Sequence, residues 1–339
     1  MNMKQFGVLP SGAHAHLYTI RCGDMEAAIT DFGATLVSLI VPDREGNLAD
    51  VVLGFDNAAA YAASADFLGA TVGRNANRIG GAEFVLNGKV CTLEKNNGKN
   101  NLHSGSQSYA FRIWNVAAHT EDSISLTLES PNGDQGFPGK AKIRVTYTLE
   151  YPAALSISYD AVCDEDTVFN MTNHSYFNLA GHENADRAME QILSMSARVF
   201  TVADAESIPT GELRSVEGTP MDFRSPKPIG RDINENYEPL HLQDGYDHNF
   251  EVFCNPCAIL SDPVSGRTMS VVTDLPGIQF YTGNFLSGAM GKNGVAYPRR
   301  SGICLETQYY PDAVNHPEWG QPVTKAGEHY HSETKYIFN

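Results

Sequence analysis

The fold class of this chain is decided by the stretch Lys142-Ile-Arg-Val-Thr-Tyr-Thr-Leu-Glu-Tyr-Pro-Ala-Ala-Leu-Ser-Ile-Ser-Tyr-Asp-Ala161. Apolar residues take every second position from Ile143 to Tyr151, and the same pattern repeats after Pro152. A period of two residues is typical of a strand that buries one face and exposes the other. The stretch therefore predicts two neighbouring strands of an antiparallel meander, each with one face in solvent.

Strand and turn signals continue on both sides of this stretch. Ile124, Leu126 and Leu128 alternate with polar residues in the same way. Asn87-Gly88 lies between two short apolar runs and is a strong hairpin signal. The turn-forming residues 42–47 separate two further strand-like runs, residues 36–41 and 51–55. Many short strands joined by Gly, Pro and Asn turns predict an all-β fold, a large antiparallel β-sandwich.

Helices contribute little to the predicted fold. Only residues 58–65 and 183–193 are candidates for short helices. The sequence has no linker-like segment of low complexity and no repeat of fixed period, so we expect one domain over residues 1–339.

Composition excludes several classes of partner. The chain carries 40 acidic and 24 basic residues, a formal net charge of −16, which disfavours nucleic acid and anionic membranes. No secretory leader and no apolar run of membrane-spanning length is present, so we expect a cytoplasmic protein. The six cysteines are scattered, and we expect reduced thiols, including Cys254 and Cys257 of the Cys-x-x-Cys spacing. A small neutral ligand fits this composition better.

Five polar clusters interrupt the strand pattern: residues 73–80, 100–105, 170–181, 244–250 and 302–310. In the third cluster, alternation along a strand places His174 and Tyr176 on a face of hydrogen-bonding side chains. In the fifth, Glu306 lies in an otherwise apolar strand, where a carboxylate must be paired, hydrogen-bonded or raised in pKa. Arg74 and Arg78 of the first cluster are either ligands for an oxygen-rich molecule or structural donors. These residues predict a polar pocket.

Two other features carry less functional weight. No glycine-rich nucleotide-binding motif is present. The pairs His14/His16 and His329/His331 lie near the termini without a third ligand, so we expect solvated side chains and no metal.

Taken together, the clusters resemble the aldose 1-epimerase (galactose mutarotase) family over essentially the whole chain. The matching stretches follow the family's order and comprise residues 33–39, 73–80, 101–103, 134–139, 172–181, 245–250, 277–285 and 305–308. The resemblance implies a β-sandwich whose concave face holds a free aldose such as galactose or glucose. It implies interconversion of the α and β anomers by acid–base ring opening and reclosure, with no cofactor.

The resemblance also assigns roles to individual residues. Glu306 is similar to the family's general base and His174 to its general acid. The substrate-binding positions that it implies are Asn77, Arg78, His103, Tyr176, Asp247 and Gln279. One departure is visible: the chain reads His103-Ser104-Gly105 and Ser108-Tyr109 where the family has His-Gly-Gly and Gly-Phe. This departure puts the shape of the adjoining loop, and with it the substrate preference, in question.

Protonation at rest follows from reference pKa values. Values of about 4.3 for Glu and about 6.5 for His predict a charged Glu306 and a partly protonated His174, helped by the carboxylate of Asp247. Three other functions remain open from the residues alone: a glycoside hydrolase using Asp247 and Glu306, a hexose-phosphate epimerase, and a non-catalytic sugar-binding module. The preferred aldose and the choice between monomer and homodimer are not decided by the sequence.

Overall fold

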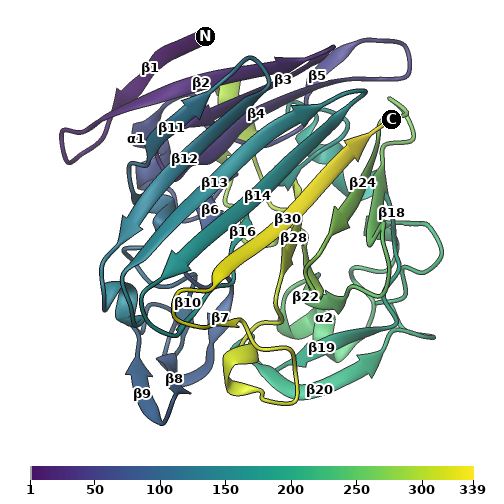
Figure 1. The fold of residues 1–339 in the computed structure, drawn as a ribbon. Coiled ribbons are helices and arrows are strands. Elements are labelled where there is room, and N and C mark those ends of the chain that lie inside the picture. The colour runs from purple at the N-terminus through teal and green to yellow at the C-terminus, as the bar shows by residue number, and fades with distance from the viewer. Residues whose placement is uncertain (1) are drawn as a thin grey trace.

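The computed structural model describes residues 2–339 and consists mainly of antiparallel sheets. Figure 1 shows the nine-stranded sheet across the front of the molecule and strands of a six-stranded sheet behind and below it. In spatial order the larger sheet contains β11 (Asn115–His119), β12 (Ser123–Ser130), β13 (Ala141–Glu150), β14 (Ala154–Cys163), β30 (His329–Phe338), β24 (Thr268–Thr273), β23 (Ala258–Ser261), β18 (Ile192–Met195) and β21 (Lys227–Pro228). The predicted all-β sandwich is confirmed.

The six-stranded sheet and an N-terminal sheet complete the main framework. The six-stranded sheet runs β17 (Tyr176–Phe177), β28 (Ile303–Gln308), β25 (Gly277–Tyr281), β22 (Asp247–Glu251), β19 (Val199–Ala203) and β20 (Pro209–Ser215). The N-terminal sheet contains β1 (Asn2–Val8), β2 (His14–Cys22), β3 (Met25–Thr30), β4 (Thr35–Pro42) and β5 (Leu48–Asp50). Strands β2 and β3 contact β12 and β13, which places this sheet against one end of the larger one.

The meander predicted from alternation is present. Strand β13 pairs along its whole length with β12 and β14, and its burial alternates residue by residue. Ile143, Val145 and Tyr147 are at most 2% exposed and face the other sheets. Full burial of an apolar side chain of this size contributes about 1.5–3 kcal/mol, so the buried face of the meander supplies much of the core.

Turn chemistry also gave a correct prediction. Strands β8 (Glu83–Leu86) and β9 (Lys89–Thr92) pair with Leu86 opposite Lys89, which leaves Asn87 and Gly88 as a two-residue loop. Both loop residues have positive φ, 51° and 75°. Asn and Gly adopt this left-handed conformation at little steric cost, and it suits the twist of a hairpin.

The helix predictions are half correct. α1 (Ala58–Ala63) begins after Asn57, whose side chain accepts a hydrogen bond from the backbone N–H of Ala60. Residues 183–193 instead form the 3-10 helix η4 (Ala185–Glu190) and enter β18. A second α-helix, α2 (Glu238–Leu242), precedes β22. None of the helices in residues 2–339 is long and apolar enough to span a membrane.

Residues 170–178 are not the single strand that alternation predicted. They follow β15 (Thr167–Val168) and contain β16 (Thr172–Asn173) and β17, and these three short strands pair with three different partners: β29 (Val323–Thr324), β6 (Thr71–Val72) and β28. All residues of the segment are buried. Because the segment is buried on both faces, the polar groups on each face need hydrogen-bond partners within the protein. The polar residues of this segment therefore do not form a solvated face.

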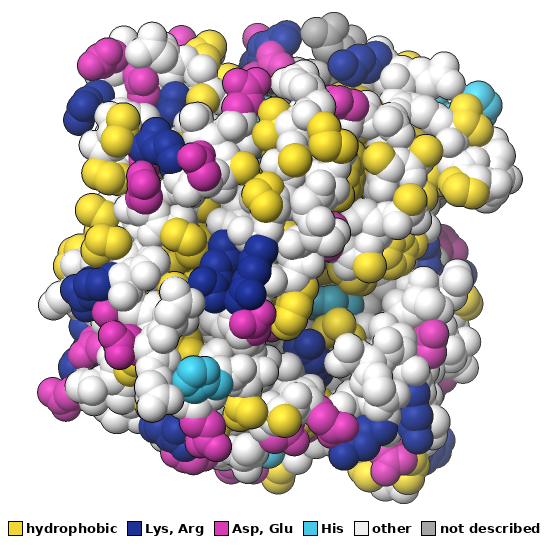
Figure 2. Space-filling view, turned by 180° about the vertical axis from the view of Figure 1, so that it is seen from behind, with side chains coloured by type: hydrophobic (Ala, Val, Ile, Leu, Met, Phe, Trp, Pro, Cys, Tyr) yellow, Lys and Arg dark blue, Asp and Glu magenta, His cyan; other side chains and the backbone are white. Residues whose placement is uncertain are grey.

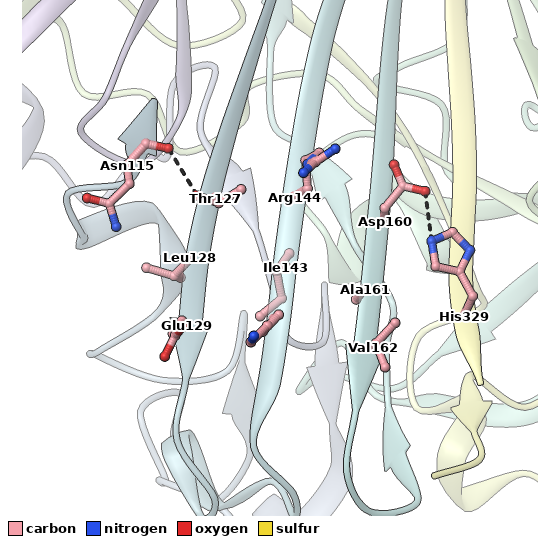
Figure 3. A pocket seen from close by; sticks show the side chains of 11 residues that line it. Asn115, Thr127, Leu128, Glu129, Ile143, Arg144, Asp160, Ala161, Val162 and His329 are labelled. Carbon is pink, nitrogen blue, oxygen red and sulfur yellow. Dashed lines mark hydrogen bonds and ion pairs between the residues drawn. The ribbon is translucent and has the colours of Figure 1, made fainter. Parts of the chain in front are cut away.

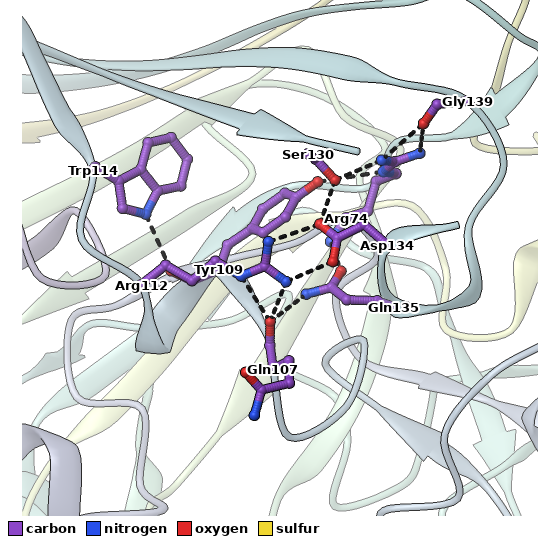
Figure 4. A network of polar contacts seen from close by, with 9 residues as sticks. All are labelled: Arg74, Gln107, Tyr109, Arg112, Trp114, Ser130, Asp134, Gln135 and Gly139. Carbon is purple, nitrogen blue, oxygen red and sulfur yellow. Dashed lines mark hydrogen bonds and ion pairs between the residues drawn. The ribbon is translucent and has the colours of Figure 1, made fainter. Parts of the chain in front are cut away.

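Arg74 is the structural arginine of the first polar cluster. It is fully buried and donates hydrogen bonds to Pro138 and Gly139 carbonyls and to the hydroxyls of Thr167 and Ser130. Figure 4 shows how this network continues through Asp134, which accepts from Ser130 and Arg112. The guanidinium therefore ties the loop at residues 73–80 to the loop at residues 134–139.

Replacing Arg74 with leucine is expected to lower the free energy of unfolding by about 2–4 kcal/mol, because several buried acceptors lose their donor. Urea denaturation followed by tryptophan fluorescence measures the change. Arg224→Leu, at an exposed arginine paired with Asp222, is the matched control and should leave the stability nearly unchanged. Equal stability of the two variants would contradict the role of Arg74.

Candidate active site

Two hollows of the surface compete for the role of active site. The larger, about 650 Å³, lies on the outer face of the nine-stranded sheet, where Arg144, Asp160 and His329 project from β13, β14 and β30 (Figure 3). It is shallow, and its charged side chains are largely solvated. The smaller cavity, about 150 Å³, lies at the six-stranded sheet, on the side that Figure 2 shows, where histidine and basic side chains are visible inside a hollow.

The smaller cavity brings together every site residue that was predicted. Its walls contain Asn77, Arg78, His103, His174, Tyr176, Asp247, Gln279 and Glu306. They come from six separate segments of the chain, so only the tertiary fold brings them together. The volume suits a molecule the size of a monosaccharide, and the lining is rich in hydrogen-bonding groups.

Strand register places the carboxylates and the amide side by side. Gln279 on β25 is directly opposite Glu306 on β28, and both strands alternate so that these side chains point into the cavity. Gln279 donates a hydrogen bond of 2.7 Å from Nε2 to Oδ1 of Asp247 on β22. The adjacent His248 points the other way and packs edge-on against Phe200. Asp247 therefore faces the cavity, and His248 packs in the sheet on the other side.

His174 lies between β16 and β17, and both its backbone N–H and its backbone carbonyl are hydrogen-bonded. Its N–H donates to the carbonyl of Ala70, and its carbonyl accepts from the N–H of Gly69. Its ring stacks on Tyr176, with 5.1 Å between centroids and 29° between planes. Nε2 is 3.7 Å from Oε2 of Glu306, and both side chains are less than 10% exposed. An imidazole and a carboxylate thus meet at the buried end of the cavity.

The loops that carry Asn77 and His103 hold each other in place. The N–H of Asn77 donates to Nδ1 of His103 at 3.1 Å, and the N–H of His103 donates to the carbonyl of Asn77. Because Nδ1 accepts, the ring is neutral with its proton on Nε2. Burial, followed by the effect of His174, holds the pKa of His103 well below its ordinary value. His103 therefore offers a hydrogen-bond donor to a ligand.

Ser104, which stands where the family has glycine, fixes the adjoining loop through hydrogen bonds of its hydroxyl. Its hydroxyl accepts from the N–H of Asn75 at 2.8 Å and donates to the carbonyl of the same residue. A glycine would leave both backbone groups without this partner. Ser104 therefore links the two loops that carry Asn77 and His103, and His103 keeps its place in the cavity wall.

Burial opposes the charged forms that reference pKa values predict. It raises the pKa of Glu306 well above the ordinary value, with a further increase from Asp247 and an opposing effect from Arg78. Burial lowers the pKa of His174 to about 4. The expectation of a partly protonated His174 at rest is wrong, and the raised pKa of Glu306 opposes its charged form, because reference values describe groups in water. A raised carboxylate pKa makes a stronger base, and a lowered imidazole pKa makes a stronger acid.

Sequence reasoning missed part of the cavity wall. Asp66 and Phe67 line it, and the ring of Phe67 lies 4.8 Å from that of His103 and 6.1 Å from that of His174. Phe67 has a φ of 55°, an unusual conformation for a bulky residue. Tyr281 and Phe285 also line the cavity. Nothing in residues 65–67 signals a site, because their position depends on the loop conformation.

The structure also locates the groups that were considered for metal or redox roles. His329 and His331 both contact the carboxylate of Asp160, and His16 contacts Asp31. Cys254 and Cys257 are free thiols. Within the described chain, His174, Cys304 and Glu306 place N, S and O atoms within 4.8 Å of one another. Cys304 faces Nδ1 and Glu306 faces Nε2, however, so the two do not converge on one nitrogen lone pair.

Comparisons with known proteins agree with this geometry. Residues 16–337 match the family described as aldose 1-epimerase. The galactose mutarotase of Sus scrofa is 40% identical over 340 residues, which is 98% of this chain and 97% of the relative. The aldose 1-epimerase of Haemophilus influenzae is 40% identical over 337 residues, 97% of each chain.

Solved structures of aldose epimerases have the same fold as this chain. The aldose epimerase homologue from C. elegans superposes with a TM-score of 0.88 at 33% identity, covering 96% of this chain and 99% of that one. The galactose 1-epimerase from Lactobacillus acidophilus superposes with a TM-score of 0.87 at 26% identity, covering 100% and 98%. Sequence and fold agree over nearly the full length of both partners, and this chain belongs to the aldose 1-epimerase family.

Proposed function

We propose that Glu306 and His174 are the base and the acid with which this enzyme interconverts the α and β anomers of free aldoses. The observation that carries the proposal is the 3.7 Å contact between His174 Nε2 and Glu306 Oε2 inside a cavity lined with hydroxyl-binding groups. Oε2 of Glu306 is buried without a hydrogen-bond partner among the described residues. A buried carboxylate oxygen without a partner is available to a substrate hydroxyl.

The reaction needs two proton transfers. Glu306 takes the proton of the C1 hydroxyl while His174 gives a proton to the ring oxygen, and the C1–O5 bond breaks. The open aldehyde rotates about C1–C2, and the reverse transfers close the ring on the other face. The two transfers together leave the proton count of the pair unchanged, and each contributes about 10²–10⁴-fold to the rate.

The pair shares one proton in two arrangements. Burial favours the neutral arrangement, with the proton on Glu306, and the reactive arrangement has the proton on His174. The two arrangements contain the same number of protons, so pH does not change their ratio. It changes only the population that carries one proton in total, and the pH profile reports the pair as a unit.

The remaining residues of the cavity are proposed to hold the sugar. Asp247 and Gln279 form one hydrogen-bonded group, and Asn77, Arg78 and His103 form a second on the facing loops. Asp247 accepts from hydroxyls, whereas Arg78 and His103 donate to sugar oxygens. Tyr176 stacks beneath His174 and sets the orientation of its ring.

We also propose that residues 1–339 act as one domain. The main apolar cluster contains buried residues from Ile20 to Phe338, drawn from the nine-stranded, six-stranded and N-terminal sheets. A shared core of this kind means that the sheets unfold together.

Asp247→Asn should move the pH profile of kcat/KM to lower pH. The charge of Asp247 raises the pKa of Glu306, so its removal makes the Glu306–His174 pair release its protons at lower pH. Arg78→Met should move the profile the opposite way, because Arg78 lowers that pKa. Polarimetric rates between pH 4 and 8 measure both shifts, and shifts in the same direction would contradict the assignment of Glu306 to the titrating pair.

A methyl α-D-galactoside tests the chemistry without a mutation. Its C1 oxygen carries a methyl group, so Glu306 has no proton to remove, and the glycoside should act as a competitive inhibitor that is not turned over. The test is inhibition of galactose mutarotation together with an assay for released methanol. Release of methanol would identify a glycoside hydrolase and overturn the proposal.

A further inference from the structure

We infer that Cys304 is a positioning residue for His174: its sulfur accepts a hydrogen bond from Nδ1–H and leaves Nε2 to exchange the catalytic proton with Glu306 and the sugar. This inference rests on the proposed role of His174. Cys304 precedes Glu306 by two residues on β28, so both side chains lie on the same face of the strand. Its side chain is fully buried, and Sγ lies 3.7 Å from Nδ1 of His174.

Aromatic contacts fix the plane of the imidazole but not its proton. Tyr176 and Phe67 stack against the ring with interplanar angles of 29° and 27°, and His103 and Tyr281 meet it edge-on. These contacts restrict rotation of the ring. The nitrogen that carries the proton is set by hydrogen bonding at the other nitrogen.

Two groups face the two nitrogens from the same strand. Glu306 lies 3.7 Å from Nε2, and the thiol of Cys304 lies 3.7 Å from Nδ1. Burial raises the pKa of Cys304 well above its ordinary value, with further increases from Glu306 and Asp247, so the sulfur keeps its proton. The sulfur of this neutral thiol accepts from Nδ1–H of the neutral ring, which leaves the lone pair of Nε2 facing Glu306.

A thiol suits a histidine whose role reverses during the reaction. Sulfur is a weak acceptor, so it accepts from Nδ1–H both in the neutral ring and in the protonated ring. A carboxylate in this place would favour the imidazolium and hold its proton. Because His174 must give a proton on ring opening and take one on closure, a weak partner that serves both states disturbs neither step. The titratable groups that face the ring are Glu306, Cys304, His103, Tyr176 and Tyr281.

The test compares Cys304→Ala with Cys304→Ser. Alanine removes the partner of Nδ1, whereas serine keeps a hydroxyl that donates and accepts. We expect Cys304→Ala to lower kcat about tenfold with a smaller change in KM, and to shift the pH profile of kcat. Cys304→Ser should recover most of the loss and the wild-type profile. Cys257→Ala, at another buried thiol outside the cavity, is the matched control and should keep both the kcat and the profile of the wild type.

A spectroscopic measurement reads the tautomer directly. In ¹⁵N-histidine-labelled protein, the His174 signals, assigned by their loss in His174→Asn, should show a protonated Nδ1 and an unprotonated Nε2 in the wild type and in Cys304→Ser. Cys304→Ala should show a mixture of tautomers. A wild-type Nε2–H tautomer, or a Cys304→Ala variant with an unchanged pH profile and an unchanged tautomer, would overturn the inference.

His174→Asn separates a wrong assignment of the acid from a wrong role for Cys304. If His174→Asn keeps wild-type activity, the proposed acid is wrong whatever the tautomer. If His174→Asn is inactive but serine does not restore what alanine removes, the acid stands and the role of Cys304 is refuted.

Discussion

Glu306→Gln is expected to lower the kcat of anomer interconversion about 10²–10⁴-fold, because the amide keeps the shape of the side chain but cannot take a proton at the reaction's pH. KM should change much less, since Asp247, Gln279 and the loop residues still bind the sugar. Polarimetry of freshly dissolved α-D-galactose gives both constants. Glu45→Gln, at an exposed turn residue, is the control and should behave as the wild type.

Folding should not suffer from this change. The folded-state pKa of Glu306 is raised, so the fold loses stability as pH rises and the buried carboxyl is forced to ionise. Removing the charge removes this cost. At pH 8, Glu306→Gln should therefore unfold at the same urea concentration as the wild type or a higher one. A variant that is both inactive and unfolded would leave Glu306 as a structural residue, against this account.

His174→Asn is expected to lower kcat by a similar factor, about 10²–10⁴-fold, because the amide places polar atoms near the ring position but donates no proton to the departing ring oxygen. The same polarimetric assay applies. His14→Asn, at an exposed histidine, serves as the control. Wild-type turnover by His174→Asn would show that the acid lies elsewhere, with His103 the next candidate by position.

His174→Asn also has a signature in stability. The pKa of His174 is lowered to about 4 in the folded protein, against about 6.5 for a histidine in water. The unfolded chain therefore binds a proton in this interval that the folded chain does not, and stability falls as pH drops from about 6.5 to about 4. The variant lacks this group, so its free energy of unfolding should fall less steeply over the same interval.

Some features of the fold could be predicted from neighbouring residues in the sequence, and others depend on tertiary contacts. Alternation and turn chemistry depend on neighbouring residues, so they located β13, β14 and the Asn87-Gly88 hairpin correctly. Glu306 was recognisable because a carboxylate in an apolar strand requires a partner. The family resemblance supplied the assignment of acid and base, which spacing alone does not contain.

Three features could not be predicted from neighbouring residues. His174 was identified from alternation along one predicted strand, but residues 170–178 form two short strands with different partners and are buried on both faces. Phe67 reaches the cavity only through a positive φ that nothing in its neighbours signals. The protonation of the Glu306–His174 pair depends on burial, which the fold sets and the reference pKa values ignore.

The central claim is that Glu306 and His174 act as one unit on a free sugar. Polarimetry of fresh α-D-galactose and α-D-glucose, with the wild type, both single variants and the double variant Glu306→Gln/His174→Asn, tests it most directly. We predict fast mutarotation by the wild type and a double variant about as slow as either single variant, because losing one partner already stops the paired transfer. Losses that multiply in the double variant, or a single variant as fast as the wild type, would contradict the claim.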